Sequence, residues 1–230
     1  YPSVVDLKKA VQVAYHETLA SAKAIKIYHE MNLDGQIGII LNLTPSYPRN
    51  ENDPEDVKAA RLADAFFNRS FLDPAIKGTF PEDLVLLLKE LDYLPEYTQS
   101  ELELIKHNTI DILGINYYQP RRIMKKESTE RLSDKPMPDD YFDNYIWPER
   151  KMNPYRGWEI YEKGIYDCLI NVRDNYGNLP CFISENGMGV EGEERFVNAD
   201  GMIEDDYRIE FVQDHLKYVH QALQEGCNVK

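Results

Sequence analysis

The stretch Cys181–Gly187, CFISENG, runs from apolar and small residues into a carboxylate, an amide and a glycine. Such a run predicts a short buried strand that ends at Glu185, so that the carboxylate lies at the edge of a hydrophobic core. A carboxylate in that position is held rigidly and is only partly solvated, as a catalytic carboxylate must be. A strand-end glutamate that simply meets water is the alternative, and position alone favours neither reading.

The same pattern occurs twice more along the chain. Gln36–Leu43 has an apolar centre and reaches its polar end at Asn42. Ile110–Ile115 is a second apolar run, and it is followed by Asn116 and Tyr118. Each of the three predicted strands therefore ends in side chains that can bind a polar ligand.

Helices are predicted between these strands, because apolar residues recur at spacings of three and four and because capping residues are present. Asp53 with Pro54 and Thr98 with Glu101 are such caps. Asp73–Pro74 is expected to stop the segment before it. Residues 119–157 form too long a connection for a passive linker and predict a functional loop. The predicted helices cover residues 4–28, 53–68, 81–90, 98–107, 158–175 and 206–225, and residues 228–230 look like the start of a fourth strand.

Near-continuous apolar strands that alternate with helices predict an α/β fold, with a parallel sheet covered by helices on both faces. In a (β/α)8 barrel, also called a TIM barrel, the carboxyl ends of several strands together build the active site. Asn42, Asn116 with Tyr118, and Glu185 would meet at that end. The sequence holds no Gly-x-Gly-x-x-Gly or Walker A motif, so nucleotide binding has no support.

Composition excludes several other classes of protein. The 230 residues fit one domain, 1–230, and the net charge of −14 comes without a basic patch, which argues against binding nucleic acid. No stretch is apolar enough to cross a membrane. Cys168, Cys181 and Cys227 are widely spaced, so reduced thiols in a cytoplasmic protein are expected. His215 and His220 are five apart, which is no metal spacing on a helix, and neither a metal nor a cofactor is expected.

Five segments in order resemble glycoside hydrolase family 1. The resemblance departs from the family pattern at Ser70, where tryptophan is usual, and at Glu162, where proline is usual. It covers essentially the whole chain, and the ordered spacing makes it far more specific than any one motif. The segments are ISENG at 183–187, LGINYY at 113–118, the Gly-x-x-Leu-Asn to Tyr-Pro segment at 38–48, the Asp-x-x-x-Asn-Arg to Asp-Pro segment at 64–74, and the Trp-x-Ile to Gly segment at 158–164.

The resemblance implies retaining hydrolysis of β-glycosides by two carboxylates about 5 Å apart. By resemblance, Glu185 is the nucleophile and Tyr118 orients it with a hydrogen bond. Asn42 and Asn116 would bind the glycone, and Trp158 would offer an aromatic face to the leaving group. Three of these residues have a structural alternative: Tyr118 as a core tyrosine, Trp158 as helix-start packing and Asn42 as a turn residue.

The segment after Glu185 most resembles bacterial 6-phospho-β-glucosidases, which are cytoplasmic. A plain β-glucosidase or β-galactosidase of the same family, or a half-barrel that only binds carbohydrate, are the alternatives. The family's Asn-Glu-Pro motif, which carries the acid/base glutamate, does not occur in the 230 residues and would precede Tyr1. We therefore expect roughly the second half of a barrel, strands 5–7 and the start of strand 8. This half would be inactive alone and would pair with the missing half or with another copy.

Overall fold

The computed structural model describes residues 4–129, 131 and 133–230. Its elements alternate between strands and helices as the sequence predicts, with several short additions. In chain order they are α1 (Leu7–Glu30), β1 (Gly38–Asn42), β2 (Ser46–Pro48), α2 (Pro54–Asp64), the π-helical turn η1 (Ala65–Arg69), α3 (Ser70–Lys77), α4 (Glu82–Glu90), α5 (Gln99–His107), β3 (Ile112–Tyr117), β4 (Arg121–Lys125), η2 (Pro138–Asp140), β5 (Phe142–Asn144), β6 (Lys151–Met152), β7 (Glu159–Ile160), α6 (Lys163–Asn175), β8 (Cys181–Asn186), η3 (Glu193–Phe196) and α7 (Asp206–Gln224).

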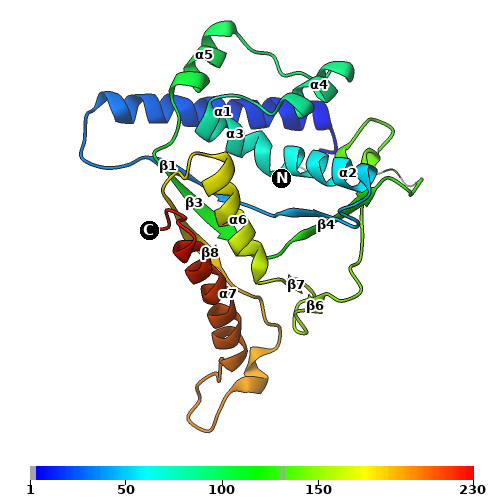
Figure 1. Cartoon of the computed structure of the whole chain (residues 1–230), viewed down its shortest axis with the longest axis vertical. Helices are drawn as coiled ribbons and strands as arrows, with labels where there is room; N and C mark the ends of the chain where they lie inside the picture. Colours follow the sequence, from blue (N-terminus) through cyan, green and yellow to red (C-terminus); the bar gives the residue numbers. More distant parts are fainter. Residues whose placement is uncertain (1–3, 130, 132) are drawn as a thin grey trace.

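A parallel sheet in the order β1-β3-β8 forms the centre of the molecule (Figure 1). The three predicted strands are therefore confirmed, and they pair as neighbours. Val229 forms a parallel bridge with Cys181 at the outer edge of β8, which confirms that a fourth strand begins there. Helices α1, α3, α6 and α7 supply the apolar side chains that pack on this sheet, which is the arrangement of a βα-repeat fold.

Helices cover only one face of this sheet, so the prediction of a sheet covered on both faces is wrong for the described residues. Side chains alternate between the faces of a strand, and Ile39, Leu41 and Ile115 point into the main core. The intervening Ile40 keeps 57% of its surface exposed. Apolar content alone predicted burial on both sides, but no described element lies against the second face.

One extra residue breaks the register between β3 and β8. Ile115 pairs with Ile183, but the next pair is Asn116 with Glu185, so Ser184 is inserted as a β-bulge. Without the bulge, Glu185 would follow Ile183 onto the helix-covered face, because alternate residues share a face. The bulge instead aligns Glu185 with Asn116 and leaves the carboxylate exposed.

The segment 119–157, of which residues 130 and 132 lie outside the described part, contains several strands, so the prediction of a loop is wrong in part. It contains β4, which pairs with β2 in parallel and with β5 in antiparallel orientation. It also contains β6, which forms a hairpin with β7. Because β7 takes up Glu159 and Ile160, α6 begins only at Lys163 and not at residue 158. Short strands of two to five residues with mixed polar content carry little periodic signal.

The expected stop at Asp73–Pro74 is also wrong, because α3 continues through Pro74 to Lys77. The proline costs the helix one hydrogen bond. Tertiary contacts offset that loss: Pro74 lies inside the protein, and Asp73 accepts a 2.6 Å hydrogen bond from the hydroxyl of Tyr176 on the C-terminal side of α6. The caps at Asp53 and Thr98 are confirmed, because their side-chain oxygens accept hydrogen bonds from the backbone N–H groups of Glu55 and Glu101.

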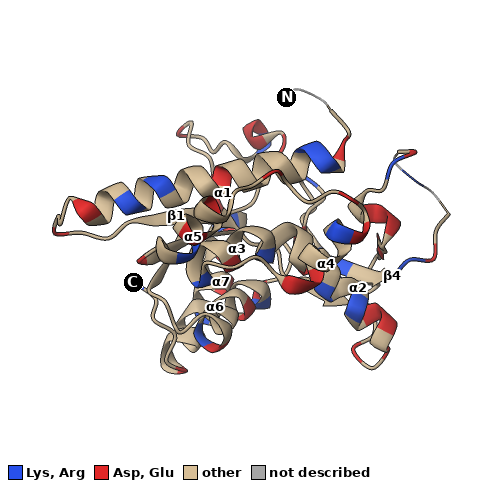
Figure 2. Ribbon diagram, turned by 90° about the horizontal axis from the view of Figure 1, so that it is seen from above, with Lys and Arg blue, Asp and Glu red and all other residues tan. Residues whose placement is uncertain are grey.

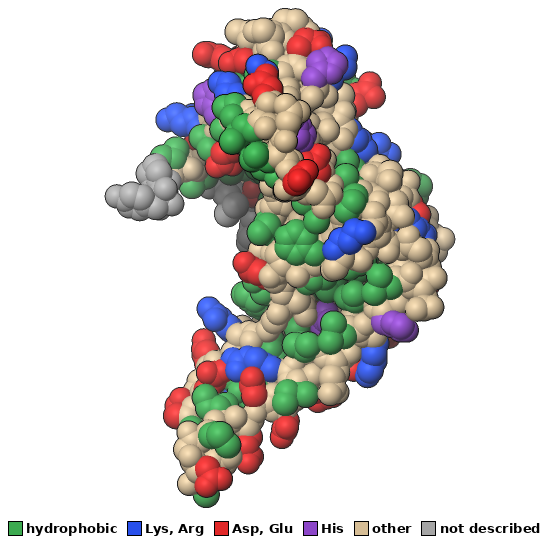
Figure 3. Space-filling view, turned by 90° about the vertical axis from the view of Figure 1, so that its left-hand side faces the viewer, with side chains coloured by type: hydrophobic (Ala, Val, Ile, Leu, Met, Phe, Trp, Pro, Cys, Tyr) green, Lys and Arg blue, Asp and Glu red, His purple; other side chains and the backbone are tan. Residues whose placement is uncertain are grey.

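Charged side chains of both signs are interspersed over the surface. Figure 2 shows this along the helices seen from above, and Figure 3 shows it on one side, including the projecting segment between β8 and α7. No helix among residues 4–129, 131 and 133–230 combines the length and apolar character needed to cross a membrane. The three cysteines are buried and free of disulfides, as predicted.

Candidate active site

Glu185 lies near the carboxyl end of β8, where its carboxylate accepts a hydrogen bond from the hydroxyl of Tyr118. Tyr118 comes directly after β3, the neighbouring strand, so sheet pairing brings the two side chains together. This hydrogen bond raises the pKa of Tyr118 above its usual value, because a phenol that donates to a carboxylate resists ionisation. Tyr118 therefore remains a donor at neutral pH.

The polar strand ends form one row across the sheet. Asn42 of β1 pairs in register with Asn116 of β3, and Asn116 pairs with Glu185. Ser184 donates a 2.7 Å hydrogen bond from its hydroxyl to the amide oxygen of Asn116, which fixes that side chain beside the bulge. Since adjacent strands lie about 4.8 Å apart, Asn42 stands about 10 Å from the Glu185 strand. The register therefore brings the three strand ends to one edge of the sheet, as predicted.

An open cavity of about 530 Å³ surrounds Glu185. Tyr118 and Trp158 line it, and their rings meet edge to face with centroids 5.8 Å apart. Arg156 lines it as well, with its guanidinium carbon 5.8 Å from the centroid of the Trp158 ring. An aromatic ring, a carboxylate and a cation around one concavity form a surface suited to a polyhydroxylated ring that is apolar on its faces.

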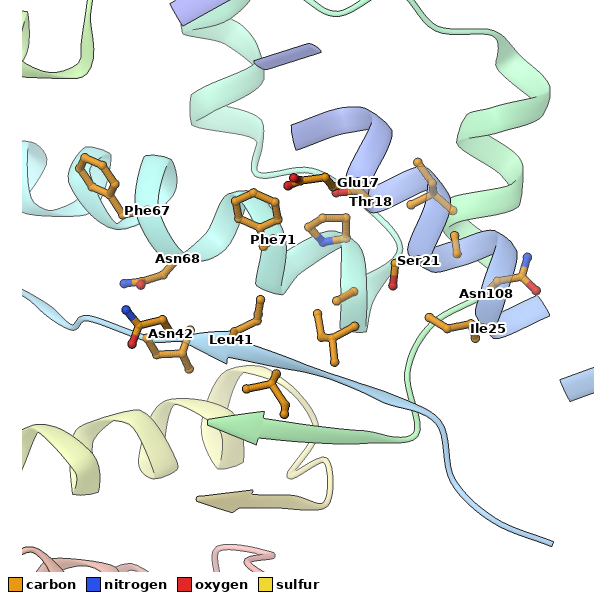
Figure 4. Close-up of a pocket in the computed structure, with 17 residues that line it drawn as sticks. Glu17, Thr18, Ser21, Ile25, Leu41, Asn42, Phe67, Asn68, Phe71 and Asn108 are labelled. Carbon is orange, nitrogen blue, oxygen red and sulfur yellow. The ribbon is translucent and has the colours of Figure 1, made fainter. Parts of the chain in front are cut away.

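Asn42 does not share this cavity. It lines a separate space of about 410 Å³ that runs beside β1, below α1 and α3. Figure 4 shows Asn42 at the end of β1, with Asn68 and Phe67 opposite it and Phe71 above Leu41. Of the five predicted site residues, the structure gathers Tyr118, Trp158 and Glu185 around one cavity, places Asn116 next to it, and leaves Asn42 at the far end of the row.

The residue that follows Trp158 belongs to a buried ion pair. Arg122 of β4 binds the carboxylate of Glu159 with hydrogen bonds of 2.6 and 3.1 Å to one oxygen. The side chains of Arg122 and Glu159 are only 11% and 9% exposed. The guanidinium also lies against the rings of Tyr47, Trp147 and Tyr161, at 4.4 to 4.9 Å from their centroids. This pair joins the strand after Tyr118 to the residue after Trp158.

Sequence reasoning missed Arg122, Arg156 and Ser184. Arg122 and Arg156 stand in none of the motifs, and Ser184 belongs to the ISENG segment, where only Glu185 suggested a chemical role. The roles of all three arise from pairings between segments far apart in the chain. The Asn-Pro-Tyr-Arg-Gly stretch before Trp158 was the one available signal, since asparagine and proline favour a tight turn. Among the described residues no cluster of histidine, cysteine or acidic side chains could hold a metal ion.

The model of the glycosyl hydrolase family 1 matches residues 1–230. The chain belongs to this family. It is 62% identical over 230 residues to the 6-phospho-beta-glucosidase GmuD of Bacillus subtilis, and the aligned region covers 100% of this chain and 49% of that protein. It is 35% identical over 231 residues to Beta-glucosidase A of Acetivibrio thermocellus, covering 100% of this chain and 48% of that protein. The chain thus spans about half the length of the curated relatives it matches.

Solved structures give the same assignment. The family 1 β-glucosidase from Thermotoga maritima superposes with a TM-score of 0.81 at 29% identity, over 100% of this chain and 48% of that one. The beta-glucosidase from Thermotoga maritima in complex with castanospermine superposes with a TM-score of 0.81 at 30% identity, over 100% of this chain and 47% of that one. The fold is therefore part of a glycosidase (β/α)8 barrel. The predicted family is confirmed.

Proposed function

We propose that this chain carries the nucleophile side of a retaining β-glycoside hydrolase that acts on 6-phospho-β-glucosides. The supporting observation is the Glu185 carboxylate, which is held by Tyr118 at a strand end and faces an open cavity with an aromatic wall. The similarity to the Bacillus subtilis 6-phospho-beta-glucosidase supports the phosphorylated substrate. The strands would be 5–7 and the start of strand 8 of the barrel.

In the first step the Glu185 carboxylate attacks the anomeric carbon. A glycosyl-enzyme ester forms while the bond to the leaving-group oxygen breaks, and a second carboxylic acid protonates that oxygen. In the second step the same group, now a carboxylate, removes a proton from water, which attacks the anomeric carbon and releases Glu185. The second group would be the acid/base glutamate of the Asn-Glu-Pro motif, which the 230 residues do not contain.

Tyr118, Asn116 and Trp158 have supporting roles in this proposal. The Tyr118 hydroxyl orients the nucleophile and disperses its charge until attack begins. The Asn116 amide nitrogen remains available to sugar hydroxyls, since its oxygen accepts the Ser184 hydroxyl. Asn42 would bind the glycone only if the sugar extends along the row of strand ends. Trp158 stacks on the leaving group.

Covalent trapping tests this proposal. The complete protein that contains this chain is incubated with a 2-deoxy-2-fluoro-6-phospho-β-glucoside, and the modified peptide is identified by mass spectrometry. We expect the adduct on Glu185, and no adduct in Glu185→Gln. Glu191→Gln is the matched control, because Glu191 is an exposed carboxylate on the same segment. An adduct on another residue, or none with active enzyme, would contradict the assignment of the nucleophile.

Substrate choice and the inactivity of the isolated chain have their own test. The 230-residue chain and the complete protein are each given 4-nitrophenyl β-glucoside and its 6-phosphate. We expect no turnover by the chain alone, and turnover of the 6-phosphate by the complete protein. Preference for the unphosphorylated glucoside would support a plain β-glucosidase, in keeping with the second relative named above. Turnover by the purified chain alone would refute the hypothesis that the acid/base glutamate lies outside these 230 residues.

A further inference from the structure

The turn that precedes Trp158 is organised by one buried side chain. Asn153, 2% exposed, lies between β6 and β7, where its amide oxygen accepts a 2.9 Å hydrogen bond from the backbone N–H of Tyr155. The backbone of Asn153 closes the turn as well: its N–H donates to the carbonyl of Trp158 at 2.6 Å, and its carbonyl accepts from Gly157 at 3.0 Å. The conformation of the turn, and so the direction of Trp158, depends on this residue.

The same side chain reaches across to a second segment. The amide nitrogen of Asn153 donates a 2.8 Å hydrogen bond to the carbonyl of Gly189, four residues after Glu185. Both halves of the Asn153 amide are thereby satisfied, one within the turn that carries Trp158 and one in the segment that follows Glu185. Figure 1 shows the β6–β7 hairpin beside the segment that leaves β8.

The side chain of Arg156 packs so closely on Gly189 that a larger residue would not fit there without movement. A Cβ atom on Gly189 would lie 2.5 Å from the Cδ atom of Arg156, so the Arg156 stem packs directly on the glycine backbone. The two segments are therefore matched in shape at this point, and the Asn153 hydrogen bond sets their separation. A side chain that is buried, fully satisfied and joined to two segments has one available conformation.

We propose that Asn153 is a positioning residue, which fixes Trp158, and with it the leaving-group wall of the cavity, against the segment that carries Glu185. The leaving-group role of Trp158 rests on the proposed function; the positioning does not. Tyr155 offers a rival anchor, since its ring packs on those of Phe196 and Tyr207 at 5.6 and 5.3 Å. The hydrogen bond to Gly189 is the shorter link and acts directly on the turn.

Fluorescence tests the positioning without any activity. The chain has two tryptophans, so Trp147→Phe leaves Trp158 as the sole reporter. In that background Asn153→Ala should raise acrylamide quenching of Trp158. Asn153→Asp keeps an acceptor for the Tyr155 N–H but sets a carboxylate against the Gly189 carbonyl, so it should raise quenching too. Asn198→Ala is the control, because Asn198 also caps a turn, with hydrogen bonds from Asp200 and Met202.

Leaving-group dependence tests the consequence for the reaction in the complete protein. With a 6-phospho-β-disaccharide, Asn153→Ala should lower kcat/KM about ten- to a hundredfold, because a displaced positioning group loses that much. With the corresponding 6-phospho-β-glycosyl fluoride, whose leaving group reaches no aromatic wall, the loss should disappear. Circular dichroism and the thermal midpoint show whether each variant is folded.

The outcomes separate the two proposals. Unchanged quenching in folded Asn153→Ala and Asn153→Asp would overturn the positioning role and favour the Tyr155 cluster as the anchor. An equal loss with disaccharide and fluoride would overturn the link to the leaving group. If the complete protein turns over neither substrate, the proposed function fails, and the quenching data still decide whether Asn153 positions Trp158.

Discussion

The buried pair Arg122–Glu159 allows the sharpest prediction of stability. Glu159→Gln removes the negative charge and leaves the Arg122 guanidinium without a charged partner in a site where about a tenth of its side chain is exposed. Breaking such a pair costs about 3–5 kcal/mol in buried sites. We expect the lower limit, about 3 kcal/mol, because glutamine still offers an oxygen to the guanidinium and three aromatic rings continue to cover it.

Thermal and urea unfolding of the chain measure this loss. For a domain of this size a loss of about 3 kcal/mol lowers the Tm by about 6–12 °C. Asp92→Asn is the control, because the Lys8–Asp92 pair has side chains that are 53% and 100% exposed, and breaking it should change nothing measurable. A fall below about 2 °C in Glu159→Gln would refute the reasoning. Replacing both partners, as Arg122→Met with Glu159→Leu, should recover most of the loss.

Three further results are expected. Gly164→Ala should destabilise the chain by about 1–3 kcal/mol in urea, since its Cβ would lie 1.9 Å from the hydroxyl of the buried Tyr117, whereas Gly187→Ala meets nothing within 4 Å. Burial lowers the pKa of His215 below 6.5, so the unfolded chain takes up the proton first and stability falls as the pH drops through 6.5; titrated unfolding of His215→Leu should lack that part of the fall. Tyr118→Phe should lower kcat of the complete protein about ten- to a hundredfold, the worth of one charge-assisted hydrogen bond, with its Tm unchanged; an undiminished kcat would contradict its role.

The central sheet was predictable because its strands are continuous apolar runs that end in polar residues. Ile39, Leu113 and Ile183 belong to such runs, and all three contribute to the main core. The helix caps were predictable for a similar reason, because the side-chain oxygen of Asp53 or Thr98 accepts a hydrogen bond from a backbone N–H only a few residues away. Signals of this kind depend on local sequence, so one chain is enough to read them.

Features that depend on distant partners were not predictable. Pro74 does not end its helix, because buried contacts offset the missing hydrogen bond. The bare face of the sheet leaves no sign in the strand composition, since Ile40 is as apolar as its buried neighbours. The same holds for the site: the family pattern indicated Glu185 and Tyr118, but Asn153 acts through Gly189, 36 residues away.

The bulge at Ser184 shifts the alternation of side chains along β8 by one residue. Up to Ile183 the strand presents odd-numbered residues to the core, and after the inserted serine the assignment is reversed. Deleting Ser184 would therefore place Glu185 directly after Ile183, still opposite Asn116 and on the open face, with Asn186 still opposite Tyr117. Substitution and deletion at this position thus share one effect: each removes the hydrogen bond from Ser184 to Asn116, and neither moves the carboxylate to the other face. The side that Glu185 occupies depends on how the extra residue is accommodated. As a bulge it leaves the carboxylate on the open face, whereas a regular strand of the same sequence would turn Glu185 into the core, where an unpaired carboxylate is strongly unfavourable.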